Sequence, residues 1–193
     1  SQKGYMIPPG LSFISVSEKA WKSIERSNLP KFYLDLNSYK KSLINDSNPF
    51  TPAVNLMFAL DEALKIMKEE GLKNIFQKHE SHKLAISEAA KKLNLKLFAN
   101  QESLSPSITA IETQNFDAES FRKSIQNKYD IQLAGGQDHL KGKIFRVGHL
   151  GYINDRDIIS AITAIGLTLY EKNIVDANDI GQALIEAKKY LKG

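Results

Sequence analysis

The spacing of apolar residues changes near Asn94, and this change constrains the fold more than any other feature of the chain. Before Asn94, apolar residues recur at helical spacing from Val54 to about Gly71 and again from Leu72 to about Leu93. After Asn94, short segments with strand character alternate with helical ones. The order strand, strand, helix, strand, strand, helix predicts a small α+β layer in which helices pack on one face of a mostly antiparallel sheet.

The first long helix has a predicted start and end. Thr51 suits the N-cap and Pro52 suits the first helical position, because proline lacks an N–H that would be unsatisfied there. Gly71 is the predicted C-cap of this helix. The second long helix places His79 on its predicted apolar side.

The remaining predicted elements are shorter. The predicted strands are 11–16, 95–99, 107–112, 131–134 and 143–148. The further predicted helices start from an N-cap at Ser17, run from Asp117 to Asn127, run from Asn154 or Asp155 to about Glu171, and cover 176–191. The polar segment 28–48 is predicted to be irregular.

The composition is that of a globular protein and argues against several classes. Of 193 residues, 42% are hydrophobic and 25% charged, which allows one or two domains with a substantial core. No apolar run reaches the length of a membrane span, so we expect no membrane partner. The net charge of +4 comes mostly from lysines beside acidic residues on amphipathic helices, so we expect no nucleic-acid partner. The absence of cysteine excludes disulfides and thiolate metal sites and fits a cytoplasmic location.

Lys3 is the first candidate for covalent chemistry. It lies in Ser1-Gln2-Lys3-Gly4, ahead of the rigid turn Pro8-Pro9-Gly10. This setting suits an amine that is held in place, and lysine amines form Schiff bases with carbonyl compounds such as pyridoxal phosphate. The alternative from these residues alone is a solvated lysine in a lysine-rich chain.

Arg146 is the second candidate, because it lies in an otherwise apolar predicted strand, Ile144-Phe145-Arg146-Val147. An arginine there needs a partner, since an unpaired buried charge is costly. A substrate carboxylate is suitable because the guanidinium fork binds it with two hydrogen bonds. The alternative is an edge-strand arginine that faces solvent or pairs with an internal aspartate.

The histidines give a weaker signal. His79 and His82 lie three residues apart on the predicted helix, as a pair of metal ligands can. Without a third nearby ligand, we expect a partly buried His79, a surface His82 and no metal site. His149 follows the Arg146 strand and is expected to orient Arg146 or to line the same pocket.

Four segments, in this order, resemble a known family. They are Ser1-Gln2-Lys3-Gly4-Tyr5-Met6-Ile7-Pro8-Pro9-Gly10-Leu11, Pro49-Phe50-Thr51-Pro52-Ala53-Val54, Ala134-Gly135-Gly136-Gln137 and Ile144-Phe145-Arg146-Val147-Gly148-His149-Leu150-Gly151. The family is the class V pyridoxal-phosphate-dependent aminotransferases, in the branch of the alanine–glyoxylate and serine–glyoxylate aminotransferases. The resemblance covers residues 1 to about 172.

The resemblance implies the α/β fold type I of pyridoxal-phosphate transferases, with long helices and a small α+β domain. It implies that Lys3 is the catalytic and cofactor-binding Schiff-base residue, and that Gln2 contacts the cofactor phosphate. Thr51 would reach the phosphate of the partner subunit's cofactor, with a purely structural N-cap role as the open alternative. Arg146 would bind the substrate carboxylate. The substrates would be a small amino acid and an oxo acid, and the protein a homodimer.

In the family, the cofactor lysine lies near the middle of a longer chain. We therefore interpret these residues as the C-terminal part of an aminotransferase. Residues 1–71 would be a remnant of the large cofactor domain with the start of the connecting helices, and 72–193 the small C-terminal domain. By itself the chain would not retain pyridoxal phosphate. The alternative is a non-catalytic fragment or interaction module, and some family members carry the label of a soluble hydrogenase small subunit.

Overall fold

A computed structural model describes residues 1–192 of the chain. The contacts divide it into two compact units, Ser1–Ile66 and the residues from Met67 onward. This division falls a few residues before the predicted boundary between 71 and 72. The assignment of the first part to a cofactor domain stays a prediction.

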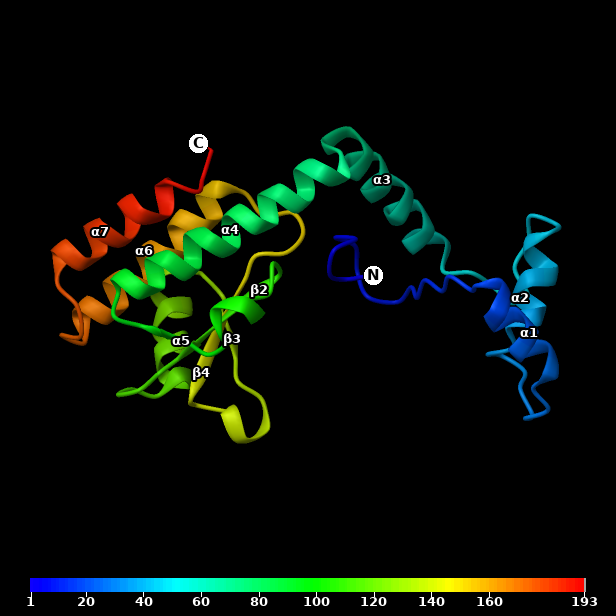
Figure 1. Cartoon of the computed structure of the whole chain (residues 1–193), viewed down its shortest axis with the longest axis horizontal. Helices are drawn as coiled ribbons and strands as arrows, with labels where there is room; N and C mark the ends of the chain where they lie inside the picture. The colour runs from blue at the N-terminus through cyan, green and yellow to red at the C-terminus, as the bar shows by residue number, and fades with distance from the viewer. Residues whose placement is uncertain (193) are drawn as a thin grey trace. The chain divides into compact units, whose positions relative to one another are not determined.

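The first unit consists of helices joined by long irregular segments (Figure 1). Its helices are α1 (Glu18–Arg26), α2 (Leu36–Leu43) and most of α3 (Val54–Glu70). Its buried hydrophobic residues, among those described, are Ile7 and Ala63. Large apolar side chains such as Phe32, Leu34 and Phe58 are exposed instead. This unit therefore presents apolar surface rather than enclosing a core.

Several predictions for this unit are wrong, and each has a local reason. Residues 11–16 form no strand, because a strand needs a neighbour to complete its hydrogen-bonded ladder and the described strands all belong to the other unit. The segment 28–48 contains α2, which starts at Asp35, whose carboxylate accepts a hydrogen bond from the Asn37 amide at 3.1 Å. The helix after Thr51-Pro52 begins only at Val54, so Thr51 is not its N-cap.

The second unit is built on a four-stranded antiparallel sheet with the order β1-β2-β4-β3. The strands are β1 (Lys96–Leu97), β2 (Ile108–Glu112), β3 (Ala134–Gly135) and β4 (Ile144–Gly148). In this register, Arg146 of β4 lies opposite Ala110 on one side and Ala134 on the other. The two central strands, β2 and β4, therefore set the surroundings of Arg146.

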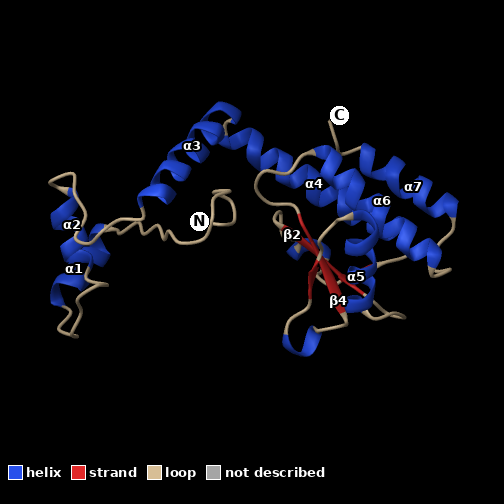
Figure 2. Ribbon diagram, turned by 180° about the vertical axis from the view of Figure 1, so that it is seen from behind, coloured by secondary structure: helices blue, strands red, loops and turns tan. Residues whose placement is uncertain are grey.

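Helices cover one face of this sheet. They are α4 (Leu72–Lys92), α5 (Ala118–Tyr129), α6 (Asp155–Glu171) and α7 (Ala177–Lys188). Helices α4 and α5 contact the strands, while α6 packs on α4, α5 and α7 (Figure 2). Phe121 of α5 meets Phe145 of β4 with ring centroids 5.2 Å apart, and both side chains are fully buried. The predicted mostly antiparallel sheet with helices on one face is confirmed.

The helix starts of this unit follow their capping residues. Asn154 caps α6 and Asp176 caps α7, each in a capping box completed by the aspartate three residues later. Asp117 caps α5 by accepting a hydrogen bond from the Ser120 amide at 2.7 Å. All three starts agree with the sequence-based predictions. Within residues 1–192, no helix combines the length and the apolar character that crossing a membrane requires.

Gly136 provides a test of how tightly the segment between β3 and β4 is packed. A Cβ added at Gly136 would lie 2.1 Å from the backbone oxygen of Leu140, which cannot move aside as a side chain could. We expect Gly136→Ala to lower the free energy of unfolding by about 1–3 kcal/mol in urea denaturation.

Gly181 is the matched control, because it lies inside α7 with open space around its Cβ position. Gly181→Ala is expected to stabilise the chain by about 0.5–1 kcal/mol through the loss of backbone freedom in the unfolded state. Equal denaturation midpoints for Gly136→Ala and the unmodified chain would contradict the close packing.

Candidate functional site

The segment that carries Lys3 folds back on itself. The Ser1 hydroxyl donates a hydrogen bond to the Pro8 carbonyl at 2.9 Å and accepts one from the Leu11 amide at 3.2 Å. The Met6 amide donates to the Lys3 carbonyl at 3.0 Å. The backbone of Lys3 is thus held in a turn, while its side chain and that of Gln2 are exposed. The amine is accessible on a backbone of defined shape.

Gly10 lies against the first turn of α3. Its φ of 140° lies in the range that side chains disfavour, and an added Cβ would come within 2.6 Å of Cδ1 of Leu56. Leu56 belongs to α3, which begins just after Thr51 and Pro52. The glycine therefore permits a close approach between the Lys3 segment and the segment that leads from Thr51 into the helix.

Thr51 is exposed in an open depression lined by residues 46–52. It precedes the first turn of α3, where the Val54 amide donates to the Pro52 carbonyl and the Leu56 amide donates to the Ala53 carbonyl, each at 3.0 Å. Because Thr51 is not the N-cap, the structural alternative for this residue loses its main support, and its contact with a phosphate stays a prediction.

Arg146 projects from the sheet face opposite Phe145 and Val147, because side chains alternate along β4. Its Nε donates a hydrogen bond to the carbonyl oxygen of Gly135 at 2.8 Å. No carboxylate lies within 4.0 Å of its guanidinium among residues 1–192. Its neighbours in the register, Ala110 and Ala134, have small side chains.

The partner of Arg146 depends on the two glycines that follow β3. Gly135 supplies the carbonyl, and Gly136 lets the backbone pass against Leu140 where a side chain would clash. On the other side, Arg122 of α5 donates from Nη1 to the Leu133 carbonyl at 2.6 Å. Arg122 from the helix layer therefore holds the chain at the start of β3, and the Gly135 carbonyl of β3 positions Arg146.

Three histidines of the second unit are buried: His79, His82 and His149. The Gly151 amide donates to Nε2 of His79 at 3.2 Å, and Nε2 of His82 lies 2.9 Å from Oδ1 of Asp155. Burial lowers the pKa of His79, and burial lowers the pKa of His149 to about 4. No set of three or more metal-ligating side chains has metal-site geometry within the described residues. The predicted buried His79 is confirmed, whereas the predicted surface position of His82 is wrong.

His149 does not orient Arg146 as expected. Its Nε2 lies 3.0 Å from the hydroxyl oxygen of Thr109, which faces the helix layer together with Val147, its partner in the register. Alternation along β4 predicts this direction, because successive side chains point to opposite faces. Residue 149 is an even number of residues from Phe145 and Val147, whereas it is an odd number from Arg146. His149 therefore belongs to the interior behind the sheet.

The structure divides the predicted site residues between the two units. Lys3, Gln2 and Thr51 belong to the first unit, and Arg146 belongs to the second. The Gly135 carbonyl was missed by sequence analysis, since a backbone oxygen carries no residue signature. The only available signal was the glycine pair directly after a predicted strand.

The chain is similar to several known proteins, although no protein-family model matches it. The soluble hydrogenase 42 kDa subunit of Anabaena cylindrica is 54% identical over 171 residues, which cover 89% of this chain and 45% of that protein. The serine–glyoxylate aminotransferase of Methylorubrum extorquens is 33% identical over 199 residues, which cover 100% of this chain and 49% of that protein. The chain spans about half the length of the curated relatives it matches.

A solved structure shows the same relationship in three dimensions. The ureidoglycine–glyoxylate aminotransferase of Bacillus subtilis superimposes with a TM-score of 0.87 at 25% identity, over 97% of this chain and 50% of that one. The superimposed residues include residues of both units of this chain.

A stability measurement tests whether Arg146 is a structural residue. Arg146→Ala removes one hydrogen bond to a half-buried carbonyl that water can reach, so we expect a loss of about 1–2 kcal/mol in the free energy of unfolding. Phe145→Ala, one residue earlier and fully buried, is expected to lose about 3–5 kcal/mol. Equal losses in the two variants would show that Arg146 mainly holds the fold together.

Proposed function

This chain belongs to the class V family of pyridoxal-phosphate-dependent aminotransferases, and we propose that the complete protein moves an amino group from a small amino acid to glyoxylate or a similar oxo acid. The observation that carries the proposal is the Arg146 guanidinium, positioned by Gly135 and free of a carboxylate partner among residues 1–192. The aminotransferase names of the relatives support the same reaction class.

Arg146 is the proposed binding residue for the substrate's α-carboxylate. Its Nε is occupied by the Gly135 carbonyl, which leaves the two terminal nitrogens to form parallel hydrogen bonds to the two carboxylate oxygens. Its register neighbours, Ala110 and Ala134, have small side chains. This geometry fixes the orientation of an amino acid rather than only attracting its charge.

Lys3 is the proposed covalent and acid–base residue. Bound pyridoxal phosphate supplies the aldehyde and the electron-withdrawing ring through which an amino group is exchanged. Lys3 would hold that cofactor through its amine, and the same amine would move the proton at the substrate's α carbon. Gln2 and Thr51 are the proposed contacts to the cofactor phosphate, from an exposed side chain and from the segment that enters α3.

We further propose that the complete protein is a homodimer. The support is the first unit, where Ile7 and Ala63 are the described buried hydrophobic residues while large apolar side chains face outward. Phe50 shows the pattern: its ring lies 5.5 Å from Phe32 and 4.7 Å from Tyr33, yet these neighbours are themselves exposed. Such a surface needs to be covered by further protein.

The hydrogenase name of one relative is not carried over to this chain. Hydrogenase metal centres depend on cysteine thiolates, and these 193 residues contain no cysteine. The roles proposed for the Lys3 amine and the Arg146 guanidinium belong to amino-group transfer instead.

Labelling of Lys3 tests its proposed role. The complete protein, incubated with pyridoxal phosphate and reduced with borohydride, is expected to carry the added pyridoxyl mass on the peptide that contains Lys3. Lys3→Arg keeps the charge but is expected to lose this label, whereas exposed Lys141, changed to Arg, serves as the control that retains it. A label on another lysine in the unmodified protein would contradict the assignment.

Kinetics of the complete protein test Arg146. Arg146→Lys replaces the planar fork by a single ammonium, so we expect kcat/KM for the amino acid to fall roughly tenfold to a hundredfold. This loss corresponds to about 1.4–3 kcal/mol of transition-state stabilisation. Arg156→Lys changes an exposed arginine on α6 and is expected to leave the kinetics unchanged. Similar losses in both variants would argue against a carboxylate contact at Arg146.

The 193-residue chain by itself is expected to show no transaminase turnover. Its relatives contain about as much sequence again, and a cofactor tethered only through an exposed Lys3 would exchange with water. A saturable rate measured with this chain alone would contradict that expectation.

A further inference from the structure

The buried histidines lie around one short segment of the second unit. This segment, Gly148–Ile153, leaves β4 directly after the Arg146 strand and leads into the N-cap of α6. His79 reaches it from α4 through Gly151, and His149 is part of it. His82, also on α4, contacts Asp155 just beyond the segment. The three side chains are 8%, 0% and 0% exposed, respectively, so a charge on any of them is separated from water.

His79 provides the first tie to this segment. Its Nε2 accepts a hydrogen bond from the Gly151 amide at 3.2 Å, which requires that this nitrogen carry no proton. Gly151 has a φ of 91°, a conformation suited to glycine, and its carbonyl accepts from the Ile153 amide at 2.9 Å. A proton on Nε2 of His79 would place two N–H groups against each other and break the tie.

His149 provides the second tie. Its Nε2 lies 3.0 Å from the Thr109 hydroxyl oxygen, and its backbone amide donates to the Ser107 carbonyl at 3.0 Å. Its Nδ1 is buried without a hydrogen-bond partner. Burial of the ring disfavours a second proton, and this effect outweighs the backbone groups of Pro106 and His149, which favour one.

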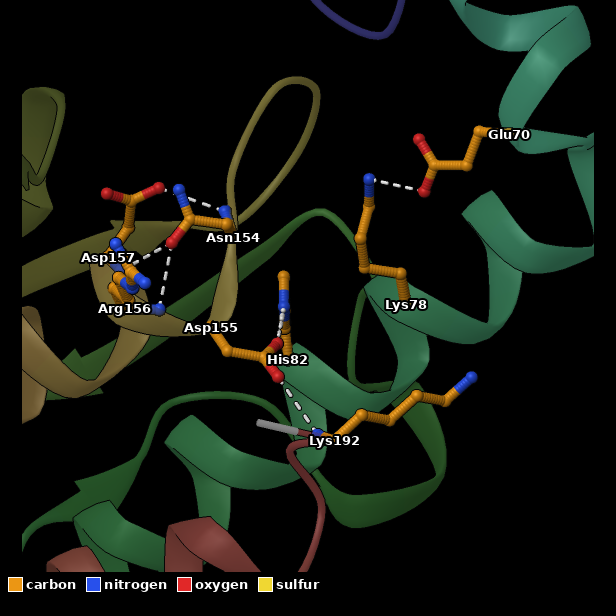
Figure 3. A network of polar contacts seen from close by, with 8 residues as sticks. All are labelled: Glu70, Lys78, His82, Asn154, Asp155, Arg156, Asp157 and Lys192. Atoms are coloured by element: carbon orange, nitrogen blue, oxygen red, sulfur yellow. Dashed lines mark hydrogen bonds and ion pairs between the residues drawn. The ribbon is translucent and has the colours of Figure 1, made fainter.

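The charged groups around the two rings do not offset this cost. For His79, burial is the largest effect against a proton and Lys78 and His82 add to it, whereas the Gly151 backbone and Glu70 favour one. Glu70 is also paired with Lys78 at 2.6 Å. His82 and His79 both disfavour a proton on His149. The carboxylate of Asp155 lies 2.9 Å from Nε2 of His82 and accepts a hydrogen bond from the Lys192 amide at 2.9 Å (Figure 3).

We propose that His79 and His149 form an acid-sensitive latch: while both rings are neutral they hold Gly148–Ile153 against α4 and β2, and protonation releases the segment. The latch is built into the second unit and does not depend on the proposed function. It would make the backbone that follows Arg146 sensitive to acid even where the sheet itself is intact.

The direction of the pH effect depends on whether the closed or the open segment binds protons more tightly. Burial lowers the pKa of His79 and lowers that of His149 to about 4 in the closed segment. Once the segment opens, both rings meet water and regain a pKa of about 6.5. The contribution of His149 is therefore at full strength above about pH 6.5, weakens as the pH falls towards 4, and loses little more below that. The contribution of His79 weakens in the same direction as the pH falls.

Hydrogen exchange of the Gly151 amide tests the proposal. In the whole chain, its protection factor, corrected for the intrinsic exchange rate, is expected to fall by up to about tenfold per pH unit for each proton taken up between pH 6.5 and 4.5. The Phe121 amide of α5, bonded to the Asp117 carbonyl, serves as the internal reference and is expected to change less. Parallel loss at both amides would mean global unfolding and would overturn the latch.

Two variants separate the latch from general acid sensitivity. His79→Gln offers an amide oxygen that accepts from Gly151 without titrating. The Gly151 protection factor is therefore expected to change less steeply with pH, because one fewer proton is taken up on opening. His139→Gln, at an exposed histidine outside the segment, is expected to keep the original dependence. An unchanged slope in His79→Gln overturns the proposal. If that variant does not fold, the curve of the unmodified chain decides: a flat ratio of Gly151 to Phe121 protection refutes the latch, and a falling ratio supports it.

Discussion

The hydrogen bond from Nε of Arg146 to the Gly135 carbonyl is the interaction on which the account of this chain depends. Placing a guanidinium in a central strand is costly unless a hydrogen-bond acceptor or a negative charge lies beside it. Here one of its edges is occupied by a backbone oxygen, and within residues 1–192 no carboxylate meets the other. The fold thus orients the fork without neutralising it. That combination is expected of a residue that binds an anion from outside.

The rest of the second unit supports this arrangement from behind. Phe121 and Phe145 pack the helix layer against β4, so the strand that carries Arg146 is fixed on its buried face. Gly136 allows the chain to turn back tightly between β3 and β4. The buried histidines add ties that lie beyond the strand. In the first unit, by contrast, much apolar surface is exposed, and its order depends less on its own packing.

Sequence signals predicted the helix starts well, because a helix cap is formed by residues that are close together in the sequence. Ser17, Asn154 and Asp176 each cap the helix that they were expected to start, because a capping side chain and its amide partner lie within three residues. Residues 11–16 failed as a strand because strands depend on a partner that the local sequence does not contain. Thr51 failed as an N-cap because the helix begins later, at Val54.

The roles of Lys3 and Arg146 stay predictions, while the backbone contact of Arg146 came only from the structure. Lys3 and Arg146 were recognisable from the motifs around them, whereas the Gly135 carbonyl has no side chain to mark it. His149 was placed on the wrong face, although alternation along β4 predicts that it points inward with Phe145. Distances between residues far apart in sequence, such as His79 and Gly151, could come only from coordinates.

The most direct measurement is a crystal structure of the complete protein with pyridoxal phosphate and a bound amino acid or carboxylate inhibitor. The account predicts that both carboxylate oxygens accept hydrogen bonds from the terminal nitrogens of Arg146, while its Nε keeps the Gly135 carbonyl. A ligand carboxylate bound at a different residue, with Arg146 paired to an aspartate or glutamate of the protein itself, would contradict it.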